Sequence, residues 1–193
     1  MMRIITGKAK GIRLKTLEGD TTRPTAERVK ESVFSMLQFD LEGREVLDLF
    51  AGSGQMGLEA VSRGAAHTTL VDQFKDAVRI IQENVTKTKL EGQCTVYQAS
   101  ALDYIQRNQG KRVDIVFLDP PYAAGLYVPV LRALWKSQML KSTTILVCES
   151  DTESIFGDDL ELASVYDIHK MVRYGKTVVT VLHVKQEDCN ERS

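Results

Sequence analysis

The sequence predicts an α/β fold in which a mostly parallel, seven-stranded sheet is covered by helices and ends in an antiparallel strand. Strand-like and helix-like segments alternate along residues 45–136, a pattern typical of parallel strands joined by right-handed crossovers. The run Val113–Leu118 is apolar at nearly every position, as expected for a strand covered on both faces. Two strand-like segments, 160–170 and 176–184, follow one another near the end and predict a terminal hairpin.

The segments before residue 45 predict a small extension of this core. Residues 3–17 alternate loosely around Gly7 and Gly11, which predicts a β-hairpin with a basic tip. Residues 24–38 place apolar side chains on one helical face, so we expect a helix there. The other expected elements are strands at 45–49, 68–72, 94–98, 113–118 and 143–149, and helices at 55–63, 74–88, 100–108 and 126–136. The predicted domains are an N-terminal basic hairpin and helix extension (1–44), a core (45–185) and a frayed tail (186–193).

The composition is that of an ordinary globular chain. Hydrophobic residues make up 43% of its 193 residues, yet no apolar run approaches the roughly 20 residues that a membrane helix needs. The apolar stretch at the start is too short for a secretory signal, so we expect a cytoplasmic protein. The three cysteines and three histidines have neither disulfide nor metal-ligand spacing, and we therefore expect no metal site.

Charge is unevenly distributed, although the net charge of the chain is only −1. Residues 1–30 contain eight Lys and Arg residues against three acidic residues, which favours a basic arm that binds phosphates. A solvated charged surface without any partner explains the same composition, and this alternative stays open.

A glycine-rich loop predicts a cofactor site. Gly52, Gly54 and Gly57 form a G-x-G-x-x-G pattern between a strand and a helix, which also fits a dinucleotide site. Asp48 separates the two interpretations, because a carboxylate at this strand end would repel a pyrophosphate and attract ammonium and sulfonium charges. The sequence therefore predicts binding of S-adenosylmethionine (SAM). The expected contacts are Asp48, Phe50, Ala51, Gly52, Ser53, Gly54 and Gly57.

Two further strand ends are expected to complete the cofactor site. Asp72 ends the second strand, where an acid can accept both hydroxyls of a ribose and can also cap the next helix. Relatives of this fold often place Asp or Asn against the adenine after the third strand. Ser100 takes that place here, and a backbone amide such as that of Ala101 can serve the ring instead.

The segment Asp119-Pro120-Pro121-Tyr122 predicts a catalytic loop after a buried strand. An aromatic exocyclic amine is a poor nucleophile because its lone pair is delocalised into the ring. The Asp119 carboxylate and the Pro120 carbonyl can accept the two amine hydrogens and aim the lone pair at a methyl group. Both prolines lack an N–H and stiffen the loop, while Tyr122 can stack on the base. We therefore expect methyl transfer to an exocyclic amine of a nucleobase.

Four segments together resemble a known family. They are Arg23 to Glu31, Asp48 to Ala65, Asp119 to Tyr122, and Arg173 to Thr177. The combination is similar to the bacterial 16S ribosomal RNA guanine-N2 methyltransferases of the RsmD type, and it covers residues 3–184. The resemblance implies a class I, Rossmann-like SAM-dependent methyltransferase that acts as a monomer. It also implies a substrate, guanine 966 of 16S rRNA in the 30S subunit or its assembly precursor.

The resemblance implies further RNA contacts. The basic hairpin tip and the first helix would meet RNA through Lys8, Lys10, Arg23 and Arg28. If the terminal hairpin turn emerges at the active edge of the sheet, Arg173 and Lys176 bind phosphate and Tyr174 stacks on a base. An exposed, solvated charge is the alternative for each of these basic residues.

Other functions remain compatible with the sequence. The catalytic loop also permits adenine N6 in DNA or RNA, or a protein glutamine, as the acceptor, although no separate DNA-recognition domain is visible. A nucleotide-dependent dehydrogenase is disfavoured by Asp48 and by the terminal hairpin. A ribosome-assembly factor that binds without catalysing is opposed by the complete set of Asp48, Gly52, Asp72 and Asp119.

Overall fold

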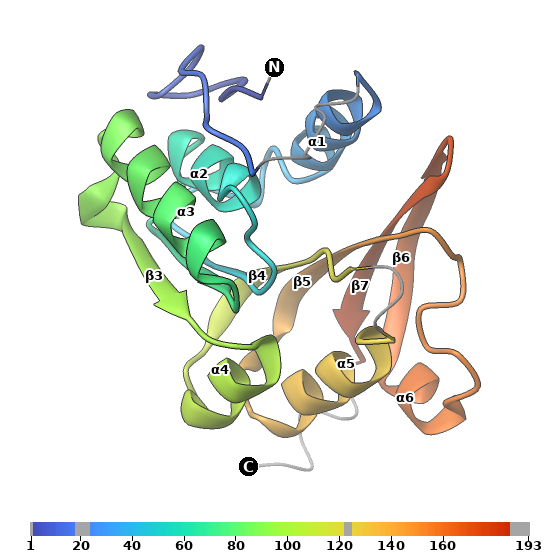
Figure 1. Ribbon diagram of the computed structural model, residues 1–193. Helices are drawn as coiled ribbons and strands as arrows, with labels where there is room; N and C mark the ends of the chain where they lie inside the picture. Colours follow the sequence, from blue (N-terminus) through green and yellow to red (C-terminus); the bar gives the residue numbers. More distant parts are fainter. Residues whose placement is uncertain (1, 18–23, 122–124, 186–193) are drawn as a thin grey trace. The chain divides into compact units, whose positions relative to one another are not determined.

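The computed structural model of the protein describes residues 2–17, 24–121 and 125–185, and the chain divides into two compact units. The first unit contains residues 1–100 and the second residues 101–193. Each unit holds strands and the helices that pack on them (Figure 1). Across the described residues, no helix is both long enough and apolar enough to span a membrane.

The first unit is built on three parallel strands. The middle strand, β2 (His67–Asp72), pairs with β1 (Glu45–Asp48) on one side and with β3 (Cys94–Gln98) on the other. Helix α2 packs on β1 and β2, and α3 packs on β2 and β3. The helical segments of this unit are α1 (Pro24–Met36), α2 (Gln55–Ser62), α3 (Lys75–Thr88) and the short 3₁₀ turn η1 (Glu91–Gln93). Because the strands are parallel, their carboxyl ends share one edge, where the predicted cofactor residues lie.

The second unit holds the remaining four strands. The fully buried β4 (Val113–Leu118) pairs in parallel with β5 (Leu140–Ser150). Strand β7 (Thr177–Val184) lies between β5 and β6 (Tyr166–Tyr174) and is antiparallel to both. The helices are α4 (Ala101–Arg107), α5 (Tyr127–Lys136) and α6 (Leu160–Val165). Seven strands lie within the described residues, and the antiparallel β7 confirms the predicted mostly parallel α/β class with an antiparallel C-terminal strand.

One predicted element is wrong in its first half. Residues 160–170 are expected as a strand, but residues 160–165 form helix α6 and the strand begins at Tyr166. The Asp159 side chain caps this helix by accepting a hydrogen bond from the Leu162 amide at 2.9 Å. Leu162 and Val165 are buried three residues apart, so the apolar pattern of this stretch has a helical spacing.

The N-terminal arm, residues 2–17, contains the predicted hairpin in a reduced form. Arg3 and Arg13 form one antiparallel bridge, and the Leu14 amide donates to the Met2 carbonyl at 2.9 Å. Gly7 turns the chain with a φ of 86° directly against helix α2. A Cβ at this position would lie 1.7 Å from the Ser62 carbonyl oxygen, so only glycine permits this close packing.

Candidate functional site

The glycine loop between β1 and α2 has one tightly packed side and one open side. A Cβ at Gly57 would lie 2.5 Å from side-chain atoms of both Thr68 and Leu70, so the glycine lets α2 approach β2 closely. Gly54 adopts a left-handed φ of 81° where the loop enters the helix. A Cβ at Gly52 would meet nothing within 4 Å, which leaves room for a ligand to approach this backbone.

Asp48 is a buried carboxylate at the end of β1, with 3% of its surface exposed. Its Oδ2 accepts a hydrogen bond from the Gly57 amide at 3.3 Å, and the Phe50 amide also stabilises it. Burial raises the pKa of Asp48 to about 7, and the nearby charge of Asp72 acts in the same direction. A cationic group of a ligand would stabilise the ionised form, whereas a phosphate would be repelled.

Asp72, at the end of β2, stabilises the same loop through hydrogen bonds. One carboxylate oxygen accepts from the Gly52 amide at 2.9 Å, and the other accepts from the Phe74 amide at 2.9 Å at the start of α3. Each carboxylate oxygen keeps a further lone pair that can accept a ribose hydroxyl. The cap and the ribose contact that the sequence predicts are therefore compatible with each other.

The other predicted cofactor residues divide between the units. Phe50 and Ala51 lie in the glycine loop, and the Ala51 amide donates to the Val71 carbonyl at 3.0 Å. The Ala99 amide donates to the Asp72 carbonyl at 3.0 Å, which holds the end of β3 beside β2. Ser100 is half-buried at the end of the first unit, and Ala101 is the buried first residue of α4 in the second. These contacts fix the backbone before the predicted adenine site.

The N-terminal arm contacts the glycine loop at Ser53 in two ways. The Ser53 hydroxyl lies 3.2 Å from the Met2 sulfur. The fully buried Asn84 side chain of α3 donates to the carbonyl oxygens of Ser53 at 2.8 Å and Lys15 at 2.9 Å, and accepts from the Lys15 amide at 2.8 Å. The arm and the loop therefore share one hydrogen-bonding side chain.

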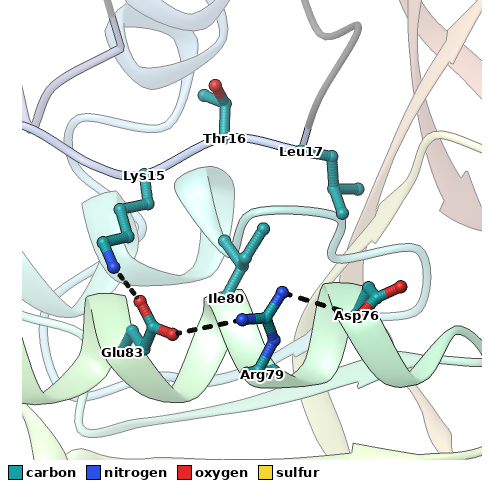
Figure 2. A pocket seen from close by; sticks show the side chains of 7 residues that line it. All are labelled: Lys15, Thr16, Leu17, Asp76, Arg79, Ile80 and Glu83. Atoms are coloured by element: carbon teal, nitrogen blue, oxygen red, sulfur yellow. Dashed lines mark hydrogen bonds and ion pairs between the residues drawn. The ribbon is translucent and has the colours of Figure 1, made fainter.

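A shallow groove of about 490 Å³ lies between the arm and the outer face of α3 (Figure 2). Figure 2 shows a chain of ion pairs beside Ile80, from Lys15 to Glu83, on to Arg79 and then to Asp76. Two cations and two anions neutralise each other along this groove, so it presents no net charge to a phosphate. The pairs are exposed, and each contributes little to stability.

Glu59 forms a second buried connection between the arm and helix α2. Its carboxylate has no exposed surface and accepts from the amides of Ile5 at 2.7 Å and Thr6 at 3.0 Å. It also pairs with Arg63 at 2.8 Å and with the buried Lys30 at 3.5 Å. Burial lowers the pKa of Lys30, while the charge of Glu59 opposes that effect.

Sequence reasoning missed both Asn84 and Glu59 as site residues. A signal was present in each case, because a polar residue falls on the apolar face of its helix. Asn84 lies three and four residues after the buried Ile81 and Ile80, and Glu59 lies between the buried Leu58 and Ala60. Polar side chains at such positions usually satisfy a specific partner, but the periodicity does not identify that partner.

The predicted catalytic loop begins at the carboxyl end of β4 in the second unit. Asp119 and Pro121 are exposed and Pro120 is buried, whereas Tyr122 lies outside the described residues. Tyr127 of α5, which the sequence did not single out, donates its hydroxyl to the carbonyl oxygens of Leu118 at 3.2 Å and of Glu149. This contact ties the end of β4, immediately before Asp119, to the end of β5.

The predicted RNA-binding residues occur in both units. Lys8 and Lys10 are exposed in the turn of the arm, and Arg28 is exposed on α1, while Arg23 lies outside the described residues. Around the β6–β7 turn, Arg173 and Lys176 are exposed and Tyr174 is half-buried. Arg173 pairs with Glu153 at 2.8 Å, so its charge is partly neutralised. Within the described part of the chain, no cluster of three His, Cys, Asp or Glu residues could hold a metal ion.

Known proteins resemble this chain over most of its length. The family described as conserved hypothetical protein 95 matches residues 2–183. Ribosomal RNA small subunit methyltransferase D of Haemophilus influenzae is 34% identical, over 79% of this chain and 80% of its own length. The protein of the same name from Escherichia coli K12 is 33% identical, over 79% and 76%. A solved structure of a hypothetical protein from Thermus thermophilus superposes with a TM-score of 0.75 at 28% identity, covering 95% of this chain and all of the other.

Proposed function

We propose that this chain, which belongs to the family described as conserved hypothetical protein 95, is a SAM-dependent ribosomal RNA methyltransferase. The acceptor is the exocyclic N2 amine of a guanine in 16S rRNA, at position 966 in the usual numbering of that RNA. The substrate is the 30S subunit or its assembly precursor, and the enzyme acts as a monomer. Support for an rRNA substrate comes from the two relatives named ribosomal RNA small subunit methyltransferase D.

The buried Asp48 carboxylate beside the open face of Gly52 is the observation that carries the proposal. A site for a dinucleotide would place positive or neutral groups against its phosphates, whereas the buried Asp48 is acidic. Asp48 is suited to the ammonium group of the methionine moiety, and Asp72 to the ribose hydroxyls. SAM, when bound, supplies an electrophilic methyl group on a positively charged sulfur.

The residues after β4 suit the acceptor amine. The exposed Asp119 carboxylate and the Pro120 carbonyl accept the two hydrogens of the guanine N2 amine, which localises its lone pair towards the methyl group. The same acceptors stabilise the positive charge that grows on nitrogen during transfer. No strong base is needed beforehand, because the amine proton can leave after the methyl group has been transferred. Tyr122 stacks on the base.

The exposed cations are proposed to bind the RNA backbone. Lys8 and Lys10 lie exposed in the turn of the arm, where the Lys8 ammonium donates to the Gln93 side chain, and Arg23 and Arg28 belong to the segment around α1. Arg173 and Lys176 flank the β6–β7 turn with Tyr174 between them. Arg173 would exchange its Glu153 partner for a phosphate, which makes this contact sensitive to salt.

A labelling experiment tests the proposal directly. The protein is incubated with tritiated SAM and one of three acceptors: unmodified 30S subunits, naked 16S rRNA or duplex DNA. Digestion of the product to nucleosides should give labelled N2-methylguanosine from the 30S subunits. Label on adenine or on a protein would contradict the guanine assignment, but methyl transfer to an amine would still hold. Absence of label on every acceptor, with SAM still bound, would favour a binding-only assembly factor.

A further inference from the structure

Glu149 is a half-buried carboxylate near the carboxyl end of β5, and the proposed mechanism does not use it. Burial raises the pKa of its carboxyl group above the ordinary value. Among residues 2–17, 24–121 and 125–185, no side chain or backbone amide forms a hydrogen bond or ion pair with this carboxylate. A carboxyl group in such a place usually has a partner, and a ligand can be that partner.

The strand register places Glu149 beside the catalytic loop within the second unit. Leu118 of β4 is paired with Cys148 of β5, and one residue further along stand Asp119 and Glu149. Neighbouring strands lie roughly 4.8 Å apart, so these two acids lie side by side at the carboxyl edge of the sheet. The Tyr127 hydroxyl holds this arrangement through the carbonyl oxygens of Leu118 and Glu149.

We infer that Glu149 accepts the N1–H group of the target guanine and thereby selects guanine among bases that carry a reactive amine. The inference rests on the proposed function and adds a residue that determines base specificity. Guanine presents N1–H directly beside its N2 amine on the Watson–Crick edge. Asp119 and Pro120 occupy the N2 hydrogens, and a second carboxylate on the neighbouring strand is available for N1–H.

The same contact rejects bases without an N1 proton. Adenine and 2-aminopurine carry a lone pair at N1, which would face the negative carboxylate of Glu149 and leave it without a donor. A site with an unpaired polar group discriminates strongly against such an analogue. The negative charge of the carboxylate is compatible with the reaction, because positive charge develops on the adjacent amine as the methyl group is transferred.

The substitution Glu149→Gln tests this role with little change in shape. Glutamine can accept N1–H through its carbonyl oxygen and can also donate its amide to an N1 lone pair. The assay uses 30S subunits reconstituted with rRNA that carries either guanine or 2-aminopurine at the nucleotide that the wild type methylates. Both bases keep the 2-amine, and kcat/KM is measured for each. Glu161→Gln, an exposed acid on α6, is the matched control.

We expect the wild type and Glu161→Gln to prefer guanine by at least about 100-fold. The preference should fall to within about tenfold for Glu149→Gln, mainly because 2-aminopurine becomes a better substrate. An unchanged preference in a Glu149→Gln protein that melts at the wild-type temperature would overturn the inference. Failure of the wild type to methylate guanine would instead overturn the proposed function, so the two failures are distinguishable.

Discussion

The Gly57 amide donates a hydrogen bond to the buried Asp48 carboxylate at 3.3 Å, which joins the first turn of α2 to the end of β1. The acid that is proposed to attract the cofactor therefore also shapes the loop that receives it. The conflict between burial and charge at Asp48 is the source of its raised pKa. Its behaviour with pH is consequently a direct probe of the site.

Asp48→Asn should remove a pH dependence of stability. The folded-state pKa of Asp48, about 7, lies above its ordinary value of 3.8. Between these values the folded protein holds a proton that the unfolded chain has lost, so stability falls as the pH rises from about 4 to about 7. Thermal unfolding without cofactor should show this fall in the wild type and in the exposed control Asp76→Asn, and a smaller fall in Asp48→Asn.

The affinity for SAM should change with pH in the opposite sense. An ammonium ligand needs the ionised Asp48, so wild-type affinity should rise between pH 6 and pH 8, with proton release below pH 7. Asp48→Asn should bind SAM more weakly and with little dependence on pH. Calorimetry in two buffers of different ionisation enthalpy measures both quantities. Equal pH dependence in the variant would assign the titration to another group.

Asp72→Ala should weaken SAM binding by about 2 kcal/mol, because the ribose loses a charged acceptor. The Gly52 and Phe74 amides lose their acceptor as well, so a modest loss of stability accompanies the change. Affinity for 16S rRNA should remain close to that of the wild type in a filter-binding assay. A parallel loss of RNA affinity would show that the ribose assignment is wrong.

Glu59→Ala should lower the free energy of unfolding by about 3–5 kcal/mol, because Lys30 and Arg63 lose their buried partner. Urea unfolding measures the effect. Glu83→Ala, which removes only exposed, solvent-screened ion pairs, should change the free energy of unfolding far less than Glu59→Ala. Equal costs for the two variants would mean that the buried carboxylate is not an organising contact.

Asn84→Asp should loosen the N-terminal arm. The new carboxylate can still accept from the Lys15 amide, but its other oxygen faces the carbonyl oxygens of Lys15 and Ser53. We expect a loss of about 1–3 kcal/mol and faster hydrogen exchange at residues 2–17. Thr88→Val removes a buried hydroxyl that bonds only within α3, so it should leave exchange in the arm unchanged.

Asp119→Ala should leave SAM affinity intact and reduce kcat by roughly two to three orders of magnitude, because the amine loses a positioned acceptor. Single-turnover kinetics on 30S subunits separates this chemical step from binding. Asp151→Ala, an exposed acid in the same unit, serves as the control. Near-normal turnover of Asp119→Ala would remove the proposed role of this carboxylate.

The strands and most helices could be predicted because their patterns are local. A nearly continuous apolar run identified β4, and glycine spacing located the loop between β1 and α2. Helix α6 was missed because it is short, and because a single side chain, Asp159, decides where the helix begins. A six-residue segment contains too little periodicity to distinguish helix from strand.

The supporting side chains of the site could not be predicted in the same way. Tyr127, Glu149 and Asn84 acquire their importance from partners that are distant in sequence. Tyr127 reaches two carbonyl oxygens on different strands, and the strand register brings Glu149 beside the proposed catalytic loop. Such relationships depend on the tertiary structure, which local propensity and motif spacing do not encode.

The buried Glu59 network also constrains how this protein can change during evolution. A homologue that loses Lys30 retains the buried Glu59 carboxylate with one fewer cationic partner. A homologue that loses Glu59 retains the buried Lys30 cation without this partner. Each single step leaves a buried charge without this partner and is costly, whereas replacing both residues by apolar ones removes these two buried charges together. Across related sequences, positions 30 and 59 should therefore vary together, while the exposed residues 15 and 83 drift independently.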